Sequence, residues 1–222
     1  MIGVLLVLLT PCVDYVIVFT GLAGGAKDRL LAATPLLMLL QIFLLPVYLR
    51  LFAGADTVAD LDIEPFVEAF VILIVIPLAA AAIVQGVSRR HRVGRVIEEV
   101  FAGAMVPLMM ATLAVVVGSQ IAAVGAEART LLRVVPLYVA FLAVMLVVGL
   151  LAGRAARLPV PEARALIFSG ATRNSLVVLP LALALPPTLA IAPLVVVTQT
   201  LVELMGMVMF VSLVPALTKT RE

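Results

Sequence analysis

Three ionisable residues, Asp14, Arg173 and Glu203, lie inside long apolar stretches of the chain. A charge at the centre of a membrane helix costs about 2.5–3.5 kcal/mol on insertion scales. We therefore expect these side chains to pair with one another or to face a polar cavity. One interpretation is a structural ion pair between Asp14 and Arg173. The other is that one or both line a path for a solute, and the two interpretations are compatible.

Glu203 differs from the other two because no Lys or Arg lies within one helical turn of it in the sequence. A buried carboxyl without a cationic neighbour can retain a proton, which is the property that a proton-coupled carrier needs. Glu203 is therefore the first candidate for ion coupling, with Asp14 and Arg173 beside it. The alternative is a neutral, hydrogen-bonded Glu203 with no part in transport.

Cys12 is the only cysteine; it directly follows Pro11 and precedes Asp14 by two residues. A buried cysteine is commonly an inert small hydrophobe. A thiolate is nevertheless a soft ligand, and a proline beside it interrupts a helix, so Cys12 is also a candidate ligand for a soft ion. With a single histidine, His91, in an Arg-rich loop, the sequence does not favour an enzyme, and nothing in it calls for a cofactor.

The composition indicates a membrane protein. Of the 222 residues, 64% are hydrophobic and 13% are charged, whereas soluble domains have about 45–50% and about 25%. A soluble enzyme, a disordered chain and a nucleic-acid-binding protein are thereby excluded as first hypotheses. A helix needs about 20 apolar residues to cross a bilayer. The sequence predicts an all-α fold with seven transmembrane helices, over residues 2–23, 30–53, 66–88, 96–124, 131–153, 163–185 and 188–216.

The basic residues of the loops predict the orientation in the membrane. One set of alternate loops, with the C-terminal tail, holds 11 Lys and Arg, and the other set holds 3. Because positive loops stay in the cytoplasm, we expect a cytoplasmic C-terminus and an external N-terminus in a multi-pass protein of the cell membrane.

Two parts of the chain, residues 10–41 and 172–199, resemble each other. Proline precedes glutamine by six residues in both, as Pro35 to Gln41 and as Pro193 to Gln199. The expected topology starts the two copies on opposite sides of the membrane, so they form an inverted repeat.

Each copy also contains an interruption in the middle of an apolar span. Pro11 marks the first, and the polar run Arg173-Asn174-Ser175 marks the second. Discontinuous helices at matching positions of inverted repeats are typical of secondary transporters. An ordinary proline kink would explain Pro11 alone but not the polar run at the matching site.

Segments 9–15, 107–113, 171–180 and 201–204 resemble the arsenical-resistance permeases of the bile acid:sodium symporter superfamily. The resemblance implies ten spans in two inverted five-helix repeats, with two discontinuous helices that cross. It implies a core part, here 1–53 and 131–217, beside a panel part, here 64–126. It places this chain from the fourth span to the tenth, so we expect a truncated member that lacks three spans.

The resemblance also implies roles for individual residues. Cys12 would bind trivalent arsenic, and Glu203 would carry the coupling proton. In sodium-coupled branches the polar residues around the broken helices hold the ion, which points to Asn174, Ser175, Gln41 and Gln199; Asn174 and Ser175 would also contact the substrate.

The first hypothesis is therefore proton-coupled efflux of arsenite or a related trivalent metalloid through the bilayer. The alternatives are a sodium-coupled organic-anion symporter, a non-transporting fragment, or a receptor-like protein of another class. H⁺ or Na⁺ would be the coupling ion, and the oligomeric state, including a homo-oligomer, is left open.

Overall fold

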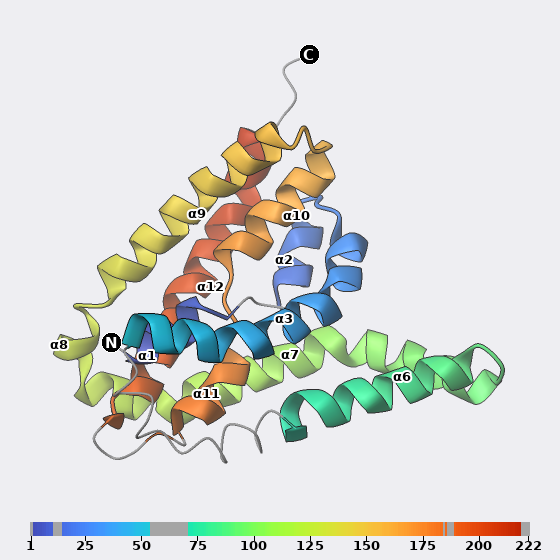
Figure 1. Ribbon diagram of the computed structural model, residues 1–222, viewed down its shortest axis with the longest axis horizontal. Coiled ribbons are helices and arrows are strands. Elements are labelled where there is room, and N and C mark those ends of the chain that lie inside the picture. The colour runs from blue at the N-terminus through green and yellow to red at the C-terminus, as the bar shows by residue number, and fades with distance from the viewer. Residues whose placement is uncertain (1, 11–14, 54–70, 184, 186–188, 219–222) are drawn as a thin grey trace.

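The computed structural model describes residues 2–10, 15–53, 71–183, 185 and 189–218, and every regular element within these ranges is helical. In chain order and with the labels of Figure 1, they are α1 (Ile2–Leu8), α2 (Val16–Leu22), α3 (Lys27–Ala53), a π-helical turn (Val71–Val75), α6 (Ile76–Ser88), α7 (Arg92–Ala126), α8 (Ala128–Leu131), α9 (Val135–Ala155), α10 (Val160–Ala171), α11 (Ser175–Leu183) and α12 (Ala192–Leu217). These helices occupy the apolar segments expected from the sequence.

Two described stretches are long and apolar enough to cross a membrane. They are Ala128–Ala155, which comprises α8 and α9, and Ala192–Leu217, which is α12. Both coincide with expected spans. That the other segments also cross, and that the two halves are inverted copies, remain predictions.

Two of the expected spans are interrupted, as Pro11 in the first and the polar run Arg173-Asn174-Ser175 in the second predicted. In the first, α1 ends at Leu8 and α2 begins at Val16. In the second, α10 ends at Ala171 and α11 begins at Ser175, with Thr172 in extended backbone at φ −93° and ψ 148°. The restart of α11 is local chemistry, because Asn174 Oδ1 accepts a hydrogen bond from the Val177 amide at 3.2 Å, as a helix N-cap does.

Helix α12 forms the centre of the packing, and each of its halves meets a different pair of half-helices. Its first half packs with α1 and α11, where Leu6, Val178 and Val196 are fully buried. Its second half packs with α2 and α10, where Val16 and Phe168 are fully buried. Figure 1 shows α12 behind α10 and between α9 and α2. Residues in the middle of α12 therefore face both interruptions.

Helices α9 and α10 approach closely through a glycine. A Cβ added to Gly149 would lie 2.9 Å from Ile167 Cγ1 and 3.0 Å from Ile167 Cα. Small residues allow membrane helices this kind of close backbone packing.

A single arginine connects three segments near the end of α12. Arg164 of α10 donates from Nε to Thr218 Oγ1 at 2.8 Å and from Nη1 to the Ala23 carbonyl at 2.9 Å. It thereby ties the loop after α2 and the end of α12 to α10.

Helices α6 and α7 form a hairpin that extends beyond the other helices (Figure 1). Both helices expose apolar side chains, among them Ile83 and Phe101, each 67% exposed, and the turn between them exposes arginines. This hairpin lies within the region expected to form the panel part, and the assignment of core and panel is taken up below as a proposal.

Candidate functional site

The carboxylate of Glu203 lies in the middle of α12 and is 1% exposed. Its Oε1 accepts a hydrogen bond from the Tyr15 hydroxyl. Its Oε2 accepts one from the Arg173 backbone amide at 2.9 Å and another from Gln199 Nε2. Tyr15 directly precedes α2 and Arg173 lies in the second interruption, so one carboxylate contacts both.

The two interruptions also contact each other directly. The Asn174 amide donates to the Thr10 carbonyl at 2.9 Å, and the Tyr15 hydroxyl lies 3.4 Å from the Arg173 carbonyl. The two discontinuous helices therefore meet at their interruptions, in agreement with the crossing that the resemblance implies. Backbone groups released from helices inside an apolar core must find such partners.

Several buried polar atoms at this crossing have no hydrogen-bond partner among the described residues. They are Asn174 Nδ2, Ser175 Oγ and Gln199 Oε1. A buried polar atom without a partner is costly, and native structures satisfy nearly all of them. The crossing therefore has donors and acceptors to offer a solute or an ion, on three residues that the sequence indicated.

The Arg173 side chain is held beside an aromatic ring. Its guanidinium carbon lies 4.6 Å from the centre of the Phe141 ring, and Nη1 donates to the Thr172 carbonyl at 2.8 Å. A guanidinium over an aromatic face is a favourable contact in an apolar setting.

Three of the expected site residues are wholly or partly outside the part of the chain that the structure describes. Cys12 and Asp14 lie outside the described residues, and with them the expected Asp14–Arg173 ion pair. The backbone of Gln41 is part of α3, but its side chain lies outside what is described.

Most of the hydrogen-bond partners of Glu203 lie outside its own helix. Two of the three donors come from Tyr15 and the Arg173 backbone amide, 188 and 30 positions away in the chain. Tyr15 and Thr10 were not singled out as site residues. The one available signal was that both flank the Pro11–Asp14 segment.

The hydroxyl of Tyr15 donates to a carboxylate, whereas that of Tyr138 donates to the Val195 carbonyl at 3.1 Å. Hydrogen bonds to charged groups contribute about 1.5–3 kcal/mol, and neutral ones about 0.5–1.5 kcal/mol. We expect Tyr15→Phe to lower the free energy of unfolding by about 1 kcal/mol more than Tyr138→Phe. Unfolding in mixed micelles by denaturant would measure both. Equal losses would argue against an ionised Glu203.

One comparison with known proteins gives a match. A family model described as "Sodium Bile acid symporter family" matches residues 1–127, which is more than half of the chain and includes the first interruption. No curated protein and no solved structure matches the chain.

Proposed function

The chain belongs to the sodium bile acid symporter family, whose members are transporters rather than enzymes, and we propose that it couples the movement of a small solute to a cation bound at Glu203. The observation that carries this proposal is the buried carboxylate that contacts both interrupted helices. When a cation binds to this carboxylate or its charge changes, its hydrogen bonds to both interruptions change at the same time. That is what coupling between an ion and a solute requires.

We propose Na⁺ as the coupling ion and an organic anion as the solute. Hard cations prefer oxygen ligands, and Glu203, Gln199 and Ser175 bring carboxylate, amide and hydroxyl oxygens to the crossing. Asn174 Nδ2 is a buried donor that an anionic oxygen could accept from. Gln41 remains a proposed further ion ligand.

The second candidate is proton-coupled efflux of arsenite. The observation in its favour is that Cys12 is only two residues from Thr10, whose carbonyl pairs with Asn174 at the crossing. In this alternative we propose that Cys12 binds the arsenic and Glu203 carries the proton, with Asp14 and Arg173 as further coupling residues.

The two candidates are separated by uptake into proteoliposomes that contain the purified chain. An inward Na⁺ gradient should accelerate taurocholate uptake at least tenfold over an equal K⁺ gradient, and Cys12→Ser should leave that uptake unchanged. Arsenite movement that depends on a pH gradient and is lost in Cys12→Ser would support the second candidate instead. If neither solute moves, both transport proposals fail for this chain alone.

The remaining parts of the proposal concern arrangement in the membrane. We propose that 1–53 and 131–217 form the core and 64–126 the panel, which is supported by the packing of α6 and α7 mainly against each other. The cytoplasmic C-terminus in the cell membrane rests on the charge of the loops.

A further inference from the structure

A cavity of about 220 Å³ lies among the ends of α9, α10 and α12, away from the crossing. Its walls include the apolar side chains of Leu150, Ile167 and Leu217 together with Arg154 and Arg157. The two membrane-capable stretches end here, at Ala155 and Leu217. The ends of membrane helices lie at the level of the lipid headgroups, so the cavity opens where a phosphate group of the bilayer would be.

The two arginines of this cavity are available for a ligand. Both are exposed, and no described residue forms a side-chain hydrogen bond or ion pair with either. No acidic residue is among those that line the cavity. The nearby acid Glu162 is paired with Arg29 instead. Among the described residues, the cavity therefore combines apolar walls with two positive charges that no acidic side chain pairs with.

The backbone of Arg157 provides an independent observation. Its φ is +51°, which makes it the non-glycine residue with a left-handed backbone among those described. It follows the end of α9, where the Leu158 amide donates to the Gly153 carbonyl at 3.0 Å and closes the helix. Glycine is the usual residue at such a position because it has no Cβ. Such a backbone is costly in a residue other than glycine and occurs most often at binding and active sites; Arg157 is among the residues that line the cavity.

We propose that this cavity binds an anionic phospholipid. The phosphate lies between Arg154 and Arg157, because guanidinium groups match phosphate oxygens in paired hydrogen bonds. An acyl chain enters between Leu150 and Leu217 and continues along the outer face of α9, where Leu151 is 57% exposed. Basic pockets between membrane helices are known to select anionic headgroups in this way.

Native mass spectrometry of the detergent-purified chain, titrated with lipid, tests the proposal. Phosphatidylglycerol should bind in preference to phosphatidylcholine with the same acyl chains. Each arginine near a headgroup contributes roughly fivefold, so the pair should contribute about 30-fold to that preference. Arg154→Gln with Arg157→Gln should remove it, and glycerol phosphate, which has no acyl chains, should not compete.

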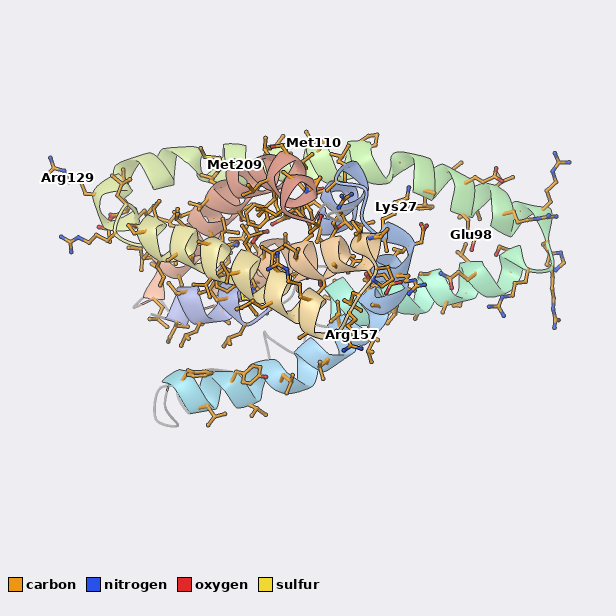
Figure 2. The ribbon with its side chains drawn as sticks, turned by 90° about the horizontal axis from the view of Figure 1, so that it is seen from above. Lys27, Glu98, Met110, Arg129, Arg157 and Met209 are labelled. Atoms are coloured by element: carbon orange, nitrogen blue, oxygen red, sulfur yellow. The ribbon has the colours of Figure 1, made fainter. Side chains whose placement is uncertain are left out.

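The chain offers a matched control at the other end of the same stretch, where Arg129 and Arg133 are exposed. Figure 2 shows Arg129 at one end of the molecule and Arg157 well separated from it, near the middle of the view. Arg129→Gln with Arg133→Gln removes the same charge and should leave the preference intact. Equal losses in both double variants, or none in the Arg154 and Arg157 variant, would overturn the proposal.

Arg157→Gly separates lipid binding from folding. Glycine relieves the left-handed backbone, so this variant should melt at a higher temperature in lipid-free detergent. It should nevertheless lose roughly fivefold in preference for phosphatidylglycerol. A variant that is more stable but keeps the full preference would show that Arg157 does not contact the phosphate.

Discussion

Glu203→Gln is expected to reduce cation-driven uptake by at least about 100-fold, which corresponds to about 2.7 kcal/mol of lost interaction with the ion. The amide has the shape of the carboxylate but no charge to neutralise Na⁺ and no proton to exchange. The variant therefore tests the carboxylate itself, and the prediction applies whether the coupling ion is Na⁺ or H⁺.

The same variant should fold because its hydrogen bonds can be kept. The amide oxygen can accept from the Arg173 amide and from Gln199 Nε2, as Oε2 of Glu203 does. The amide NH₂ can donate to the Tyr15 hydroxyl, which can accept as well as donate. Glu203→Ala would instead remove the acceptor of all three donors, so we expect poor folding in that variant.

Initial uptake rates in proteoliposomes, normalised to reconstituted protein, provide the measurement. Glu99→Gln is the matched control. Glu99 lies in α7 and is exposed, so this substitution removes the same charge at a site away from the crossing. Parental rates in the Glu203→Gln variant would show that the buried carboxylate is structural only. Equal loss in Glu99→Gln would indicate a general charge effect.

Gly149→Leu is expected to lower the stability of the fold strongly. A side chain at Gly149 meets the Ile167 backbone at 3.0 Å, which no rotamer change can relieve. Overpacking costs about 1–3 kcal/mol and occasionally more. Helices α9 and α10 would have to move apart, which would also disturb the packing of α10 against α2 and α12.

The control is Gly118→Leu in α7, because a Cβ added to Gly118 meets no described atom within 4 Å. This variant should not lose stability, because replacing a glycine inside a helix is favourable by up to about 1 kcal/mol where the side chain has room. The fraction of protein that remains monodisperse in detergent after heating compares the two variants. If both melt at the parental temperature, the close contact between α9 and α10 does not limit stability.

The sequence could predict the interruptions because their residues are out of place in an apolar span. Arg173 and Asn174 are costly in a continuous membrane helix, and the structure has extended backbone beside them at Thr172. Proline alone was a weaker guide. Pro107 lies inside the uninterrupted α7, where a kinked or locally adjusted helix accommodates it.

The partners of Glu203 could not be predicted in the same way. Hydropathy and spacing describe one helix at a time, whereas Tyr15 reaches Glu203 through the crossing of segments 188 positions apart. Tyr15 also carries no charge, so nothing in an apolar span marks it as unusual. The three-dimensional arrangement was needed to show that one carboxylate serves both breaks.

The distance in sequence between Tyr15 and Glu203 has a consequence for biosynthesis. These residues are 188 positions apart, so at 5–20 residues per second the ribosome takes about 10–40 s to deliver the acceptor after the donor. Throughout that interval the first interruption lacks the carboxylate, and for most of it the Asn174 amide that later pairs with Thr10 is also missing. The crossing can therefore form only late in translation. Until α12 is synthesised, the half-helices α1 and α2 must remain in the membrane without the hydrogen bonds that join them to Glu203 and Asn174.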